Sequence, residues 1–353
     1  MAKNIGRGSI LFVGMLLLAT ALCARAAYNL DIPMIIIFGD STVDVGTNNY
    51  LTTLVKSDFK PYGRDCGQVG TGRFSNGLLV PDFIAQDVGL HSPLAFLDPE
   101  AKGEKLLWGI NFASSGSGFM QSTADIFNVR SFTQQLEDFK TYTSNLIALV
   151  GPSRAEELMS KAIYVISTGS NDWVNNYFLV GRATYSIPEW HDQIRNSIPG
   201  YIKEIYNAGA RRILVASLPA IGCIPAAISL FGDGTDECVS YINEAAVDMN
   251  SAIQSIIGNF QSSGAMPGVK FLYVDTYSDL LGASQNPSAY GFEEARKACC
   301  GSGMIEVAIL CNADSPGTCS DASKYLFFDS FHPSQKFYEM VAQKALGKIV
   351  STF

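Results

Sequence analysis

The sequence predicts an α/β fold, a doubly wound, mostly parallel, five-stranded sheet flanked by helices in three layers. Five short apolar runs recur along the chain at helix-sized intervals, at 34–38, 109–113, 162–167, 212–217 and 269–274. Their apolarity is continuous rather than alternating, which is typical of parallel strands that are covered on both faces. A strand followed by a helix, repeated along the whole chain, favours a doubly wound sheet.

Helical patterns fill the gaps between these strands. Apolar residues at three- and four-residue spacing predict helices after Gly77 and over 131–149, 188–207, 237–260 and 333–347. Ser131 and Gln134 have the spacing of a capping box, and Pro333 suits a first helical turn. We therefore expect the strands to be joined by helices rather than by long loops.

The beginning of the chain is typical of a secretory signal peptide. Residues 1–26 consist of a short positively charged leader, an apolar run over 10–22 and a small-residue cleavage pattern. The apolar run is short for a membrane span, so we expect cleavage rather than an uncleaved anchor. The expected product is a secreted, extracellular chain without a stable membrane anchor, in which 27–353 form a single domain.

Cysteine usage fits export. Seven of the eight cysteines lie beyond residue 26, so at least one is expected to be free or paired outside the chain. Four of them crowd into 299–319, within a Cys-rich stretch at 276–325 that we interpret as an insertion in the domain. Their spacing lacks the C-x2-C pairs of a zinc site. We expect one disulfide between Cys223 and Cys238 and one or two within 299–319.

Charge and composition exclude several classes of function. There are 33 Asp and Glu against 25 Lys and Arg, a net charge of −8, so no basic surplus is present to bind nucleic acid. Only 16% of the residues are charged and 11% are aromatic, a composition that argues against an intrinsically disordered chain. The glycine patterns of dinucleotide and P-loop sites, and the G-x-S-x-G of α/β-hydrolases, do not occur in the sequence.

Polar segments follow the strands at the sheet edge where ligands collect. The first exit carries Ser41, the second carries Gly116 in a Ser–Gly run, and the third carries Asn171. Near the C-terminus, Asp329 and His332 stand three residues apart in a tight turn. A serine nucleophile needs a neighbouring base, and that base needs an orienting carboxylate. Backbone N–H groups of Ser41 and Gly116, with the Asn171 amide, are suitable donors for an oxyanion.

Four motifs stand in order at widely separated positions: FGDSTVDVGTNNY, NFASSGSGF, STGSNDW and FDSFHPS. In this order they resemble the motifs of plant-type GDSL esterases/lipases of the SGNH hydrolase superfamily, and the resemblance covers nearly all of the mature chain. It implies an SGNH hydrolase-like, flavodoxin-like three-layer fold. The roles that it implies are nucleophile for Ser41, base for His332, partner carboxylate for Asp329, and oxyanion-hole donors for Ser41, Gly116 and Asn171.

The same resemblance points to further positions. The family pairs its nucleophile motif with Asp44 and Gly46, and both are present. Ser115 departs from the smaller residue that is more usual before Gly116, so we expect its hydroxyl to crowd or hydrogen-bond the oxyanion loop. The other two histidines, His91 and His191, we interpret as exposed surface residues.

The implied activity is that of a secreted serine esterase or lipase that hydrolyses carboxylic (lipid or acyl) esters through an acyl-enzyme on Ser41. The resemblance implies a small-molecule or lipid ester substrate, no cofactor and no metal, and the charge balance predicts no nucleic-acid partner. Two alternatives stay open. One is an acyltransferase that uses the same acyl-enzyme, and the other is a non-catalytic secreted binding protein on the same scaffold.

Overall fold

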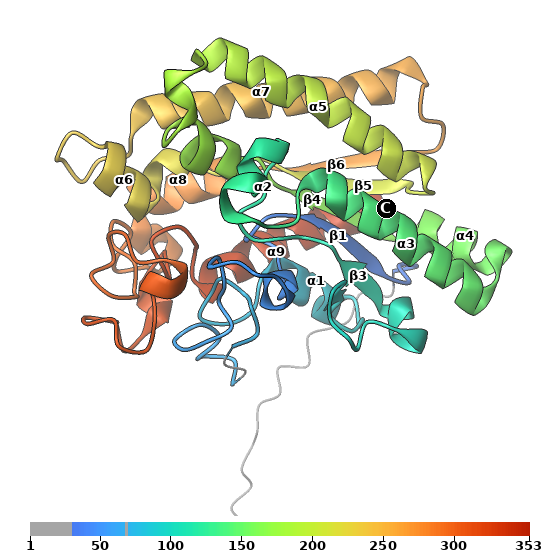
Figure 1. The fold of residues 1–353 in the computed structure, drawn as a ribbon, viewed down its shortest axis with the longest axis horizontal. Helices are drawn as coiled ribbons and strands as arrows, with labels where there is room; N and C mark the ends of the chain where they lie inside the picture. The colour runs from blue at the N-terminus through green and yellow to red at the C-terminus, as the bar shows by residue number, and fades with distance from the viewer. Residues whose placement is uncertain (1–29, 68–69) are drawn as a thin grey trace, which may run out of the picture.

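The computed structural model describes residues 30–67 and 70–353, so the expected signal peptide lies outside the described residues. Parallel strands form one sheet in the order β2-β3-β1-β4-β5-β6, with helices on both faces (Figure 1). This arrangement confirms the doubly wound α/β class. The strands are β1 Ile35–Gly39, β2 Leu94–Ala95, β3 Gly109–Asn111, β4 Ile163–Ser167, β5 Arg212–Ala216 and β6 Lys270–Val274.

Each of the five predicted strands is confirmed, but the predicted strand count was wrong by one. The additional strand, β2, has only two residues and pairs with β3 at the edge of the sheet. A strand of two residues is too short to show a pattern in the sequence. The other five strands have the flavodoxin-like order, in which the chain first moves from β1 to one side and then crosses to the other. Ligands are expected where these directions diverge, at the exits of β1 and β4.

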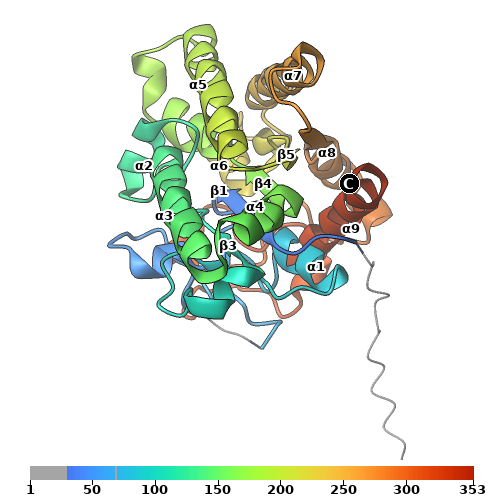
Figure 2. The same ribbon diagram turned by 90° about the vertical axis from the view of Figure 1, so that its right-hand side faces the viewer.

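Helices cover the two faces of the sheet unequally (Figure 2). The α-helices are α1 Val80–Asp87, α2 Gln121–Phe127, α3 Phe132–Val150, α4 Pro152–Lys161, α5 Ile187–Asn207, α6 Pro225–Phe231, α7 Ser240–Ser263, α8 Tyr277–Gln285 and α9 Gln335–Thr352. Alternate residues of β1 point to opposite faces: Ile36 and Phe38 belong to a hydrophobic cluster that includes residues of α3, α5 and α7, whereas Ile35 and Ile37 belong to a cluster that includes residues of α1 and α9.

The sequence predicted the starts of these helices unevenly. The capping box is confirmed, because the Ser131 and Gln134 side chains each accept a hydrogen bond from the other residue's backbone N–H. The prediction that Pro333 occupies the first turn of the last helix was wrong. Pro333 forms an isolated bridge with Phe327, and α9 begins at Gln335 and continues past Gly347.

The expected disulfides are confirmed. They join Cys223 to Cys238, Cys299 to Cys319 and Cys300 to Cys311, and Cys66 is free. The two bridges within 299–319 belong to a small hydrophobic cluster that also contains Tyr62, Phe74 and Phe328. The Cys-rich stretch is therefore packed against the segment that leads to Asp329.

Candidate active site

The chain turns sharply after β1, and this turn presents Ser41 at the carboxyl edge of the sheet. A Cβ on Gly39 would lie 2.1 Å from the Ser167 carbonyl oxygen, so the close approach of β1 and β4 requires glycine. The Asp40 N–H donates to that carbonyl at 3.0 Å. The Thr42 N–H and hydroxyl donate to Asp40 Oδ1 at 3.0 and 2.7 Å. The turn is thus fixed on both sides of Ser41.

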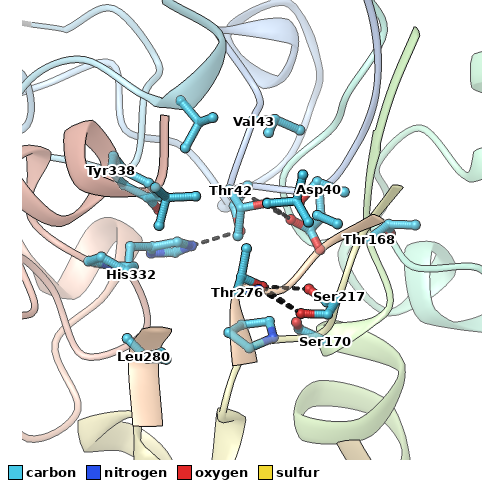
Figure 3. A pocket seen from close by; sticks show the side chains of 18 of the residues that line it. Asp40, Thr42, Val43, Thr168, Ser170, Ser217, Thr276, Leu280, His332 and Tyr338 are labelled. Carbon is cyan, nitrogen blue, oxygen red and sulfur yellow. Dashed lines mark hydrogen bonds between the residues drawn. The ribbon is translucent and has the colours of Figure 1, made fainter. Parts of the chain in front are cut away.

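The His332 ring lies between Ser41 and Asp329. Its Nε2 is 2.7 Å from Ser41 Oγ, and its Nδ1 is 2.8 and 2.9 Å from the two Asp329 carboxylate oxygens. The backbone N–H groups of Phe331 and His332 donate to Asp329 Oδ1 at 2.9 and 2.7 Å. Figure 3 shows His332 directed across the cavity toward the turn that carries Thr42. Residues separated by 291 positions therefore form one hydrogen-bonded row.

Asn171 follows β4 and precedes the π-helical turn Asp172–Tyr177. Its Nδ2 donates to the Ser117 carbonyl at 2.8 Å, and its Oδ1 accepts from Asn175 Nδ2 at 2.7 Å. A carboxamide nitrogen carries two hydrogens, so one donor remains for a ligand. Asn171, Ser41 and His332 all line the same cavity.

Gly116 lies in the loop after β3, next to the Ser117 carbonyl that Asn171 binds. Its φ is +87°, and a Cβ there would lie 3.1 Å from the Phe127 ring. Gly116 is not among the residues that line the cavity, so it stands beside the other candidate residues rather than among them. Within 30–67 and 70–353, the backbone N–H groups of Ser41 and Gly116 have no hydrogen-bond partner.

The Ser115 hydroxyl neither crowds nor hydrogen-bonds the oxyanion loop, because its partner is the Asp44 carboxylate in the segment after β1. Its Oγ and its backbone N–H donate to Asp44 Oδ2 at 2.7 and 2.9 Å. The other Asp44 oxygen accepts from the N–H groups of Gly46 and Thr47 at 2.8 and 2.7 Å. Asp44 therefore ties the segment after Ser41 to the exit of β3, a role that the sequence motif alone does not reveal.

Asp172, like Asp40, is a buried carboxylate to which sequence reasoning gave no role. It accepts hydrogen bonds from the N–H groups of Phe119 and Met120 at 2.7 and 3.1 Å and from the Thr123 hydroxyl at 2.5 Å. Burial raises the pKa of Asp172 to about 7 and that of Asp40 to about 6. The only sequence feature that points to a role for Asp172 is its place next to Asn171 in the STGSNDW motif.

A cavity of about 110 Å³ is lined by Ser41 and His332. It lies between the sheet and the layer formed by α1 and α9, and its walls are mostly apolar. Phe337, Val341 and Ala345 repeat every four residues along α9 and so form one stripe of about 12 Å in length. Other apolar side chains in its wall are Val80, Ile84, Val165, Leu214 and Val274.

The remaining histidines lie away from this cavity. His91 is exposed, as predicted, and stacks on Trp108 with ring centroids 4.2 Å apart. The prediction for His191 was wrong, because only 18% of its side chain is exposed.

Comparison with known proteins decides the family. The family model for GDSL-like Lipase/Acylhydrolase matches residues 35–345. The chain belongs to this family. It is 43% identical over 320 residues to the GDSL esterase/lipase At5g03810 of Arabidopsis thaliana, which covers 89% of this chain and 90% of that protein. It is 40% identical over 342 residues to the GDSL esterase/lipase APG of the same plant, covering 96% of each.

Membership of the GDSL family makes the chain a carboxylic ester hydrolase.

Among solved structures, the lipase Lip_vut3 from a goat rumen metagenome is similar to this chain. The match covers 89% of this chain and 97% of the Lip_vut3 chain, at 14% identity and a TM-score of 0.37. That score is too low to support a conclusion. No helix within the described residues has the length and apolarity needed to cross a membrane.

Proposed function

We propose that this GDSL hydrolase is a secreted serine esterase or lipase in which Ser41 is the nucleophile, His332 the general base and Asp329 the carboxylate that orients it. The observation that supports this most strongly is the 2.7 Å contact between His332 Nε2 and Ser41 Oγ, with Asp329 on the opposite ring nitrogen. Nucleophile, base and orienting group in one row meet the geometric requirement for covalent catalysis of acyl transfer.

The reaction steps follow from the hydrogen-bonded arrangement of Ser41, His332 and Asp329. His332 Nε2 accepts the Ser41 proton while Oγ attacks the ester carbonyl carbon. Negative charge then develops on the carbonyl oxygen. The unpartnered N–H groups of Ser41 and Gly116 and the remaining N–H of the Asn171 side chain stabilise this charge. The C–O bond to the alcohol then breaks, and the alcohol leaves with the proton from His332. His332 next takes a proton from water as the water oxygen attacks the acyl carbon. The bond between that carbon and Ser41 Oγ then breaks, the acid leaves, and His332 returns the proton to Oγ.

The cavity supports an assignment of the acyl group. Its apolar walls and small volume suit a slender, unbranched chain better than a branched or cyclic acid. The stripe of Phe337, Val341 and Ala345 extends away from His332 along α9, so carbon atoms added to the chain would contact successive turns of this helix.

A series of p-nitrophenyl esters tests the activity and this assignment together. We expect hydrolysis of straight-chain esters that is absent in Ser41→Ala and slower for branched acids of the same carbon number. Ala345→Phe should shift the preferred acyl length to shorter chains, whereas Val350→Phe, on the exposed side of the same helix, should not. An unchanged chain-length profile in Ala345→Phe would place the acyl group elsewhere.

Secretion is supported by the disulfides, which form and persist in oxidising compartments. We propose cleavage after residue 26, which leaves 27–353 as a single domain and removes Cys23 with the leader. Thiol counting on the denatured, unreduced protein tests this. One thiol per chain, at Cys66, is expected, whereas two thiols would show that Cys23 is retained.

A further inference from the structure

The Cys-rich stretch contacts the turn that carries Asp329 and His332. The N–H groups of Cys299 and Cys300 donate to the carbonyls of Phe327 and Phe328 at 3.0 and 2.9 Å, two residues and one residue before Asp329. On the other side of Asp329, the Ser330 N–H donates to the Glu306 carbonyl at 2.9 Å. The insertion therefore borders the proposed catalytic turn on both sides of its carboxylate.

Tyr62 connects the same insertion to the Asp329 side chain. Its hydroxyl donates to Asp329 Oδ2 at 2.8 Å and accepts a hydrogen bond from the Ala308 N–H at 2.9 Å. The backbone donors of Phe331 and His332 bind the other oxygen, Oδ1. Tyr62 thus donates a hydrogen bond to Oδ2, as the backbone N–H groups of Phe331 and His332 do to Oδ1.

The position of Tyr62 is itself fixed by packing. The residue is fully buried, and its ring makes edge contacts with Phe74 and Phe328 at centroid distances of 5.4 and 5.6 Å. Two residues further on, Arg64 Nη1 donates to the Cys319 carbonyl at 2.8 Å. Burial, and then the charge of Asp329, raise the pKa of Tyr62 well above its usual value, so the hydroxyl stays protonated and can donate.

We propose that Tyr62 is a positioning residue for Asp329, and that the disulfide-held loop 300–311 fixes it through the Ala308 N–H. This inference rests on the proposed function. A bound Oδ2 keeps the carboxylate from rotating away from His332 Nδ1 and spreads its negative charge over a second donor. The row that begins at Ser41 consequently continues through His332, Asp329 and Tyr62 into the Cys-rich insertion.

Tyr62→Phe tests the inference because it keeps the ring and removes only the hydroxyl. We expect kcat to fall about tenfold with little change in KM, since the lost bond is made to a charged group rather than to substrate. More negative charge remains on Asp329 in this variant and favours the protonated imidazole. The acid limb of the pH profile of kcat/KM should therefore move to higher pH, by on the order of half a unit.

Tyr142→Phe is the matched control. Tyr142 is also fully buried, and its hydroxyl donates to the Leu106 carbonyl at 2.9 Å, remote from the cavity. This variant should lose stability without moving the acid limb. If Tyr62→Phe shows the wild-type kcat and an unmoved acid limb, or only a loss of stability like that of Tyr142→Phe, the inference is overturned.

A double-mutant cycle tests the part played by the loop. Replacing both Cys300 and Cys311 with Ser should lower kcat in the wild-type background and have little further effect in Tyr62→Phe, because the loop acts through that hydroxyl. Equal effects in both backgrounds would overturn the role of the loop. The proposed function is checked separately, since wild-type protein that failed to react at Ser41 would overturn that function and leave the Tyr62 contact a structural one.

Discussion

Asn175 donates a hydrogen bond from Nδ2 to Asn171 Oδ1 at 2.7 Å, and this contact determines which way the Asn171 amide faces. With Oδ1 held by Asn175, the Asn171 nitrogen is directed to the Ser117 carbonyl, and one N–H is left unused. The donor that we assign to the oxyanion is therefore oriented before substrate arrives, which is the condition under which such a donor is most effective.

Asn171→Ala should raise the barrier of the chemical step by about 3 kcal/mol, or roughly 100-fold in kcat. Asn175→Ala should act in the same direction but less, about tenfold, because the amide is still present but less well oriented. Steady-state kinetics on a short-chain p-nitrophenyl ester measure both, with the exposed Asn259→Ala on α7 as the control. An unchanged kcat in Asn171→Ala would reduce this residue to a structural role.

The pH profile tests His332 as the base. Because an imidazole accepts a proton only when it is neutral, kcat/KM should fall on the acid side of its pH profile as the base becomes protonated. Asp40, whose pKa burial raises to about 6, is a second group that could produce such an acid limb. The limb should persist in Asp40→Asn if His332 is the base, whereas its disappearance in that variant would assign the limb to Asp40.

Asp172 should make stability depend on pH. Burial raises its pKa to about 7 in the folded protein, while an unfolded aspartate titrates near pH 4. Between these values the folded state binds more protons than the unfolded state, so the free energy of unfolding falls as pH rises, by up to about 1.4 kcal/mol per unit.

Urea unfolding at pH 5 and pH 7 checks this. Asp172→Asn should reduce the difference between the two pH values, and Asp236→Asn, at an exposed site, should leave it as in the wild type. The same difference in all three proteins would show that Asp172 is ionised throughout.

Ser115→Ala should destabilise the fold by about 1–3 kcal/mol, because the hydroxyl donates to the buried Asp44 carboxylate. Ser255→Ala is the control, since that exposed hydroxyl bonds only a carbonyl of its own helix. Denaturant unfolding measures both variants. Equal stability of Ser115→Ala and wild type would mean that the backbone donors to Asp44 suffice.

Much of the sheet could be predicted from the sequence because its strands are buried on both faces. β1, for example, is buried along its whole length and appears as an unbroken apolar run. The start of α9 could not be predicted, because Pro333 is held by its bridge to Phe327, a tertiary contact. Gly347 does not end the helix, since glycine is only moderately unfavourable there and nothing lies within 4 Å of where its Cβ would be.

In the candidate site too, the residues that directly follow a strand could be predicted from the sequence, and a residue that meets its partners only through folding could not. Ser41 and Asn171 could be predicted because each follows a strand whose exit meets the switch point of the sheet. Tyr62 could not, because it meets Ala308 and Asp329 across 246 and 267 positions and stands in no motif. The segment that carries Tyr62 is brought next to Asp329 only by folding, whereas Asp329 itself lies three residues from His332 in the same turn.

Covalent labelling measures the nucleophile most directly. The wild-type protein, treated with a fluorophosphonate probe and analysed by peptide mass spectrometry, should carry one adduct on Ser41, and the adduct should disappear in Ser41→Ala and be strongly slowed in His332→Ala. Labelling of another serine, or equal labelling of Ser41→Ala and wild type, would contradict the assignment of Ser41.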